Sequence, residues 1–260
     1  MDNTVNIKIG DVATLIRCKN DCFIDSAKEF YKNFLSESRP DYEVEIVYGK
    51  PASNQGIKKL IFTESGYIAL PGLFVGQLGA NSGKIVVNLQ NSFSIIKYFL
   101  KILYSYLCLR KNEVMLHAAG IVKDDKGYVF IGPSDSGKST VTELSKGCTV
   151  LSDETIIIRE NMIFGTPFGT GRYANASNKI CSLFRLIKDK STYLEELDYG
   201  KGFSELLSNF LIFEERTVKT VLPLCENLIN KFPLYKLHFS LDDSFWKKIE
   251  ENEHIRKISN

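Results

Sequence analysis

Hydrophobic and polar residues alternate with the period of a β-strand at several places in the first part of the chain. The clearest case is 42–48, where every second side chain is apolar, the pattern of a half-buried strand. Helical spacing around Asp25-Ser26 instead predicts a helix over 23–35 that begins near these two residues. Further strands are predicted at 5–9, 12–17, 59–62, 67–70 and 84–89, with a turn at Gly10-Asp11 and a loop at 51–56.

Residues 93–109 form the most apolar stretch of the chain, so a membrane span must be weighed against a buried helix. A span is nearly continuously apolar over about 20 residues. This stretch instead carries Lys97 and Lys101, which fall four residues apart on one helical face, together with serines and tyrosines. It therefore predicts an amphipathic helix that is buried on one side, and no membrane partner is expected.

The second part of the chain has the pattern of short strands joined by tight turns. A strand over 114–122 carries His117, and the turn at 124–127 predicts a hairpin with the next strand, 128–131. A helix is expected to follow at 139–145. The remaining predicted elements are a strand at 148–151, a hairpin of 155–159 with 162–164, an irregular and mobile loop at 165–178, a strand at 234–239, and a last helix from Asp242 or Asp243 through 249.

Composition and charge narrow the class of protein. The 260 residues are 44% hydrophobic and 25% charged, which is ordinary for a globular protein. The net charge of +2 is too small to favour nucleic acid or an acidic membrane surface as the main partner. Of six scattered cysteines only Cys18 and Cys22 are close, and they lack the second half of a zinc site. Free thiols and an N-terminus without a signal-peptide pattern predict a cytoplasmic protein.

The most informative motif is the segment 132–139, which matches the phosphate-binding loop G-x-x-x-x-G-K-S/T at every specified position. A strand is predicted before it and a helix after it, so loop amides and the helix N-terminus point to one place where a polyphosphate can bind. Lys138 is expected to reach the outer phosphates, and the Ser139 hydroxyl to bind Mg²⁺. A chance match in a Gly- and Ser-rich turn is the alternative, and the flanking elements count against it. The residues expected to bind the phosphates are Gly132, Pro133, Ser134, Asp135, Ser136, Gly137, Lys138, Ser139 and Thr140.

Two acidic residues, Asp153 and Glu154, closely follow the predicted strand at 148–151. In parallel α/β arrangements the carboxyl ends of strands face the same crevice as the phosphate loop. One carboxylate would then bind Mg²⁺ and the other would accept a proton from a hydroxyl; a capping or surface pair is the alternative. His117 lies in an apolar strand, where a lone histidine is usually a satisfied core residue, so its spacing alone assigns it no catalytic role.

The run from Leu116 to Arg159 resembles the catalytic domain of HPr kinase/phosphorylase, a bacterial serine kinase. Both have a strand with a histidine and small residues, a hairpin, the phosphate loop with its helix, and a strand that ends in two acidic residues. Segments 164–169 and 235–246 are similar to later landmarks of the shorter HPr-kinase-related proteins, including those beside peptide-modification genes. The resemblance implies an α/β fold over 111–260: a nucleotide-binding core of mixed sheet with helices, like that of phosphoenolpyruvate carboxykinase. The strand and helix pattern of 1–110 predicts a small α/β region before it.

The resemblance also implies roles for single residues. These roles are phosphate and metal binding for Lys138 and Ser139, metal binding for Glu154, proton acceptance for Asp153, and support of the acidic pair for His117. The family commonly has two aspartates where this chain has Asp153-Glu154. The downstream Gly-Arg-Asn signature has only a loose echo at 171–175, which argues against HPr itself as the acceptor. Arg172, in the irregular loop, either closes over the phosphates or is simply solvated.

From these observations we expect an ATP- and Mg²⁺-dependent kinase that transfers the γ-phosphate to a hydroxyl, in the first place a serine of a small protein or peptide. Two other classes stay open: a nucleotide-binding regulator without transfer activity, and a small-molecule enzyme, either a metabolite kinase or a carboxykinase-like lyase. The sequence also leaves open whether the protein forms a homo-oligomer. Nor does it decide whether the region 1–110 recognises a substrate or only packs on the core.

Overall fold

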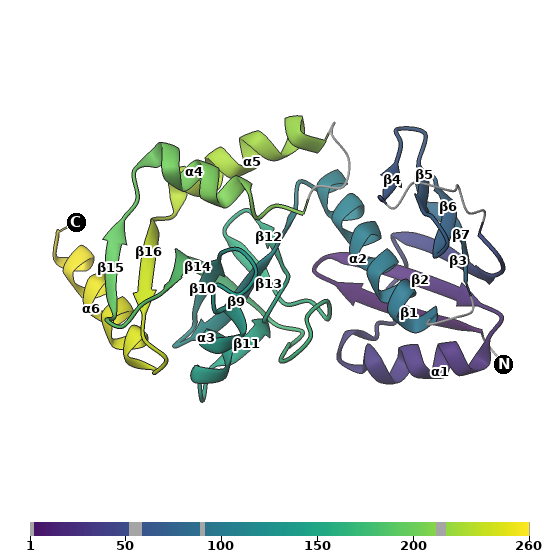
Figure 1. The fold of residues 1–260 in the computed structure, drawn as a ribbon. Coiled ribbons are helices and arrows are strands. Elements are labelled where there is room, and N and C mark those ends of the chain that lie inside the picture. The colour runs from purple at the N-terminus through teal and green to yellow at the C-terminus, as the bar shows by residue number, and fades with distance from the viewer. Residues whose placement is uncertain (1–2, 52–58, 89–91, 212–216, 260) are drawn as a thin grey trace. The chain divides into compact units, whose positions relative to one another are not determined.

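The chain folds into two units of mixed α/β structure in the computed structural model (Figure 1). The first unit is Met1–Arg110, and the second is Lys111–Leu211 with Val218–Asn260. The predicted α/β class is confirmed at this level. The structure describes residues 3–51, 59–88, 92–211 and 217–259, so the loop predicted at 51–56 lies outside the described residues apart from Pro51.

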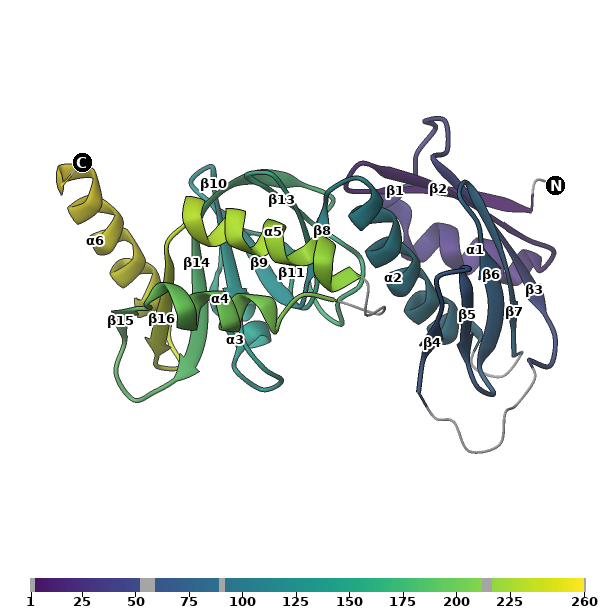
Figure 2. The ribbon, with the colours of Figure 1, turned by 90° about the horizontal axis from the view of Figure 1, so that it is seen from above.

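The first unit is built on a seven-stranded sheet in the order β1-β2-β3-β7-β6-β5-β4 (Figure 2). Its strands are β1 (Thr4–Ile9), β2 (Val12–Cys18), β3 (Tyr42–Tyr48), β4 (Ile61–Phe62), β5 (Tyr67–Leu70), β6 (Phe74–Leu78) and β7 (Ser82–Val87). The sequence predicts all of them except β6, whose alternation is interrupted by Gly76. A Cβ on Gly76 would lie 2.5 Å from Ile85 Cγ2, so glycine allows β6 to pair closely with β7.

Two α-helices accompany this sheet, α1 (Asp21–Phe30) and α2 (Ser92–Arg110), with the short 3-10 helix η1 (Lys32–Phe34) after α1. The predicted start of α1 at Asp25 is wrong. Asn20 Oδ1 accepts the backbone N–H of Phe23 at 3.0 Å and caps the helix earlier. The prediction of α2 is confirmed, but its buried residues surround most of the helix instead of forming one side. Within the described part of the chain, no helix is long and apolar enough to cross a membrane.

The second unit is built on a nine-stranded mixed sheet. Its path runs β11-β9-β10-β14-β13-β12-β8, and β16 joins it by pairing with β14 and with β15. The strands are β8 (Val114–Leu116), β9 (Ala118–Lys123), β10 (Lys126–Ile131), β11 (Thr149–Ser152), β12 (Ile156–Arg159), β13 (Met162–Phe164), β14 (Ser177–Lys188), β15 (Tyr193–Glu196) and β16 (Leu234–Phe239). The long strand β14 pairs parallel with β10 on one side and with β16 on the other.

Both predicted hairpins of the second unit are confirmed. Asp124 and Asp125 have φ of 49° and 57° in the two-residue turn from β9 to β10, as a tight hairpin turn requires. The other hairpin pairs β12 with β13 around Glu160. The single strand predicted over 114–122 is wrong, because His117 lies at a bend: β8 pairs with β12, whereas β9 pairs with β10 and β11.

The helices described in the second unit are α3 (Lys138–Leu144), α4 (Tyr199–Leu207), α5 (Thr217–Lys231) and α6 (Ser244–Ser259). Helices α3 and α6 share a core with the sheet, in which Phe130 and Phe184 stack and Trp246 meets Phe130 edge-on. Side chains alternate along β14, so Phe184 joins this core whereas Arg185 reaches Glu205 of α4 on the opposite face.

The sequence predicts the end of the chain better than the segment before it. Strand β16 is confirmed, and α6 begins after Asp242, whose Oδ1 accepts the N–H of Ser244 at 2.9 Å. The helix continues to Ser259, so its predicted end at 249 is wrong. The sequence does not predict β14, β15, α4 or α5, and the irregular segment is shorter than expected because β14 begins at Ser177.

We expect Ser145→Ala to destabilise the second unit by about 1–3 kcal/mol, because it leaves a buried N–H without its acceptor. Trp246 Nε1 donates to Ser145 Oγ at 3.0 Å, and Ser145 is fully buried. Trp246 is the single tryptophan of the chain, so its fluorescence during urea unfolding reports on this unit. The matched control is Ser204→Ala on the exposed side of α4. Equal unfolding midpoints for the two variants would contradict this packing.

Candidate functional site

Three segments that the sequence singles out meet at one edge of the second sheet. Strand β9 pairs antiparallel with β10, with Ala118 opposite Ile131, and also antiparallel with β11, with Gly120 opposite Ser152. β10 and β11 therefore run in the same direction on either side of β9. Their carboxyl ends, which lead into the phosphate loop and the acidic pair, lie at the edge where β9 begins after His117.

The loop after β10 uses glycines where the backbone requires them. Gly132 and Gly137 have φ of 153° and 106°, values that side chains disfavour. A Cβ on Gly137 would lie 2.5 Å from Phe239 Cζ. Helix α3 then begins at Lys138 without a side-chain cap, with Ser139 exposed in its first turn. Amide groups of an uncapped first turn lack partners within the helix and attract anions.

Lys138 is held at the entrance of the loop. Its side chain is nearly buried, and Nζ donates to the carbonyl oxygens of Gly132 at 2.6 Å and Pro133 at 3.0 Å. Burial lowers the Lys138 pKa, while the negative charge of Glu154 acts in the opposite direction. The lysine head is therefore fixed beside the first residue of the loop, within electrostatic reach of Glu154.

Asp153 is enclosed by a glycine-containing turn, 169–171, and is only 4% exposed. Its Oδ2 accepts the N–H of Gly171 at 3.0 Å and the Thr170 hydroxyl at 3.3 Å. A Cβ on Gly169 would overlap the carboxylate, and one on Gly171 would lie 2.9 Å from Oδ2. Asp153 Oδ1 is buried and has no hydrogen-bond partner among the described residues. A buried carboxylate oxygen in this state is costly unless something binds it.

The segment that contains this turn is anchored on both sides. Ala174 N–H donates to the Leu151 carbonyl at 3.3 Å, and Arg172 Nη1 donates to the Thr142 carbonyl of α3 at 3.1 Å. Arg172 thus lies against the helix that follows the phosphate loop. The segment expected to be mobile is tied by hydrogen bonds to the strand before the acidic pair and to α3.

Glu154 takes a different environment from Asp153. It is half-buried, its N–H donates to Ser152 Oγ at 3.3 Å, and Thr155 N–H donates to the same oxygen at 3.1 Å. The Ser152 hydroxyl therefore shapes the turn that carries both acids. Within the described residues, no group of three or more His, Cys, Asp or Glu side chains could hold a metal ion. Any metal here would need hydroxyl, phosphate or water ligands as well.

The sequence misses a buried asparagine that joins His117 to the loop. Asn209, just after α4, accepts the His117 N–H with its carbonyl at 2.7 Å and the Gly132 N–H with Oδ1 at 3.3 Å. Its Nδ2 donates to the Glu205 carbonyl at 2.7 Å. His117 itself is half-buried beside the start of β9. Nothing in the local sequence distinguishes Asn209, because its role depends on where α4 lies.

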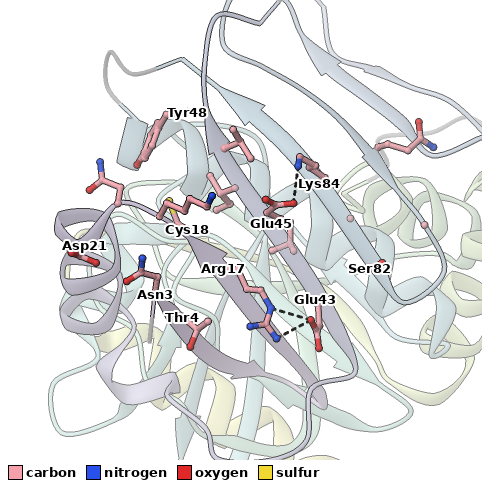
Figure 3. A pocket seen from close by; sticks show the side chains of 18 of the residues that line it. Asn3, Thr4, Arg17, Cys18, Asp21, Glu43, Glu45, Tyr48, Ser82 and Lys84 are labelled. Atoms are coloured by element: carbon pink, nitrogen blue, oxygen red, sulfur yellow. Dashed lines mark hydrogen bonds and ion pairs between the residues drawn. The ribbon is translucent and has the colours of Figure 1, made fainter. Parts of the chain in front are cut away.

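A second polar region lies in the first unit, over β2, β3 and β7 (Figure 3). It is an open hollow of about 1540 Å³. Ion pairs cross its floor between Arg17 and Glu43 at 3.2 Å and between Lys84 and Glu45 at 2.9 Å. Neither the residues of the loop 132–139 nor the pair Asp153-Glu154 lines it. The hollow and the sheet-edge site therefore belong to different units.

In comparisons with known proteins, the sequence matches no protein-family model and no curated protein. The geometry of the sheet edge and the motifs in the sequence therefore carry the functional argument.

We expect Gly169→Ala to destabilise the second unit by about 1–3 kcal/mol, the usual cost of forcing an extra methyl group into a filled site. The backbone at Gly169 has no left-handed φ, so the cost comes from the Asp153 carboxylate. The control is Gly200→Ala in α4, where the nearest atom to a new Cβ is 3.6 Å away. Alanine should be neutral or favourable there. Trp246 fluorescence during urea unfolding measures the stability of both variants. Equal stabilities would contradict the enclosure of the Asp153 carboxylate by the turn 169–171.

Proposed function

We propose that this protein is an ATP- and Mg²⁺-dependent kinase that transfers the γ-phosphate to a hydroxyl group. One observation carries the proposal: strand pairing brings a complete phosphate-loop motif, His117 and the pair Asp153-Glu154 to the same sheet edge. A phosphate loop alone binds a nucleotide, whereas transfer also needs a metal ligand and a group that takes the acceptor's proton. Glu154 and Asp153 are the residues that we propose for these two roles.

The residues at this edge fit Mg²⁺-ATP. The uncapped first turn of α3 offers amide groups to phosphates, and Lys138 lies at the end of the loop where outer phosphates belong. Ser139 and Glu154 would hold Mg²⁺, with phosphate oxygens and water completing its shell, as is usual for this ion. Mg²⁺ would supply charge neutralisation on the phosphates. The unpartnered Asp153 Oδ1 supports a ligand or substrate group at this point.

In the proposed reaction the acceptor's hydroxyl oxygen forms a bond to the γ-phosphorus of ATP, and the bond from that phosphorus to the bridging oxygen breaks, so that ADP leaves. Asp153 would take the hydroxyl proton, because a positioned carboxylate acts as a general base. Lys138 would neutralise charge on the transferred group. Asn209 would fix the loop entrance relative to the His117 bend through its two hydrogen bonds. Since Asp153 is nearly buried, the turn 169–171 must move before an acceptor can reach it.

The acceptor that we propose is a serine of a small protein or peptide in the cytoplasm. Support comes from the resemblance to HPr-kinase-related proteins over Leu116 to Arg159, which also suggests a core like that of phosphoenolpyruvate carboxykinase. The absence of the Gly-Arg-Asn signature argues against HPr as that protein. A hydroxyl on a small molecule stays a competing acceptor and is separated by the labelling experiment below.

A second candidate function is a nucleotide-binding regulator without transfer activity. The observation that favours it is the enclosure of Asp153, whose Oδ2 is already occupied by Gly171 and Thr170. If the turn 169–171 never opens, the carboxylate cannot reach a hydroxyl. Such a protein would bind Mg²⁺-ATP through the phosphate loop and return it unchanged.

The nucleotide-binding part of the proposal predicts that Lys138→Ala weakens Mg²⁺-ATP binding by roughly 10- to 100-fold. The lost charge-assisted hydrogen bonds are worth about 1.5–3 kcal/mol, which corresponds to this decrease in affinity. Isothermal titration calorimetry measures it. Lys146→Ala, an exposed lysine just past α3, is the control and should bind ATP like the wild type. Equal ATP affinities of the two variants would show that Lys138 does not take part in nucleotide binding.

The transfer step predicts that Asp153→Asn retains ATP binding but lowers the transfer rate by about 10²- to 10⁴-fold, the usual contribution of a general base. The assay follows γ-labelled ATP in lysate of the source cells, with Asp125→Asn in an exposed turn as the control. Acid-stable phosphoserine made by wild type and control alone supports a protein kinase. Label in a small molecule instead changes the acceptor class, and no label despite ATP binding supports the regulator.

A further inference from the structure

The strand next to the phosphate loop brings a second cation to it. Strand β14 lies beside β10, and their register places Arg185 opposite Ile131, the residue before the loop. Arg185 Nη1 lies 3.4 Å from the position that a Cβ on Gly132 would take. The Arg185 side chain is 19% exposed, so it faces the loop entrance from a mostly buried position. Arg185 also lies outside the run of sequence that carries the family resemblance.

The position of Lys138 identifies the phosphates that Arg185 would meet. In this type of loop the lysine reaches the β- and γ-phosphates. Lys138 Nζ is bound to the carbonyls of Gly132 and Pro133, so the outer phosphates belong at the entrance end of the loop. Arg185 stands at that same end. Burial is the main cause of the lowered Lys138 pKa and Glu154 opposes it, while the positive charge of Arg185 lowers that pKa further, so the two cations are close enough to interact.

The contacts of Arg185 hold it in place without using the whole guanidinium. Its Nε donates to Glu205 Oε2 at 2.8 Å, and Nη1 donates to the Leu186 carbonyl. Nη2 makes no hydrogen bond to the described residues. A guanidinium binds phosphate oxygens with two parallel N–H groups. Arg185 therefore has a donor to spare and a carboxylate partner that a phosphate can replace.

We propose that Arg185 binds the terminal phosphate of a nucleoside triphosphate and thereby makes the site prefer a triphosphate to a diphosphate. This inference rests on the proposed nucleotide binding and specifies which part of the nucleotide is recognised. Glu205 is the counter-ion that holds Arg185 when no terminal phosphate is present. The two partners compete for the same guanidinium, so removing the charge of Glu205 should favour the triphosphate.

The test is isothermal titration calorimetry with Mg²⁺-ATP and Mg²⁺-ADP on the full chain. Arg185→Gln should weaken ATP binding by roughly 10- to 100-fold, since charge-assisted hydrogen bonds are lost, and leave ADP affinity within about twofold. Glu205→Gln should strengthen ATP binding up to about fivefold, with ADP unchanged. The matched control is Lys236→Gln: Lys236 pairs with Arg185 in the sheet register and binds Glu195 at 2.7 Å. It should change neither affinity.

The outcomes separate this inference from the proposed function. If the wild type binds neither nucleotide, the proposed function fails and the inference fails with it. If the wild type binds ATP, but Arg185→Gln lowers the affinities for ATP and ADP equally or leaves both unchanged, only the role of Arg185 is overturned. If Arg185→Gln does not fold, Glu205→Gln decides, because an unchanged ratio of ATP to ADP affinity overturns the competition between Glu205 and the phosphate.

Discussion

The antiparallel pairing of β9 with β10 on one side and β11 on the other is the interaction on which the candidate site depends. Because β9 lies between them, β10 and β11 run the same way and end at the same edge. The phosphate loop follows one strand and the acidic pair follows the other. A bend at His117 is needed as well, since it lets β9 pair with β10 and β11 while β8 pairs with β12 elsewhere in the same sheet. Asn209 then links that bend to the loop.

The acidic pair shows how one turn can place two neighbouring carboxylates in different environments. Asp153 is enclosed by the turn 169–171 and keeps one oxygen unpartnered, whereas Glu154 is half-buried and acts electrostatically on Lys138. The turn 169–171 keeps water away from the Asp153 carboxylate. In the proposed reaction this turn would have to move before a substrate could reach the carboxylate. The proposed base, Asp153, is thus more buried than the proposed metal ligand, Glu154. In a nucleotide-binding regulator without transfer activity, this enclosure of Asp153 would be permanent.

Local sequence signals predict the elements that have a clear hydrophobic alternation or characteristic turn residues at their ends. The hairpin turns, the strand and helix on either side of the loop 132–137, β3 and β16 are marked by alternation, glycine or acidic turn residues, and the structure contains them. The sequence does not predict β14 and α4, because their residues pack against elements far away in the chain. The sequence does not reveal Arg185 and Asn209 for that reason: both reach Gly132 through strand order and helix placement, which no local pattern encodes. The enclosure of Asp153 likewise depends on a later segment.

Hydrogen–deuterium exchange with and without Mg²⁺-ATP tests the central claim most directly, because it reads the loop and the acidic pair in one experiment. We expect slower exchange of backbone amides over 132–145, where phosphates would bind the loop and the first turn of α3, and altered exchange at 152–154 and 169–172. Strands β1 to β7 should exchange as before. Unchanged exchange over 132–145, or protection confined to the first unit, would contradict a phosphate site at this sheet edge.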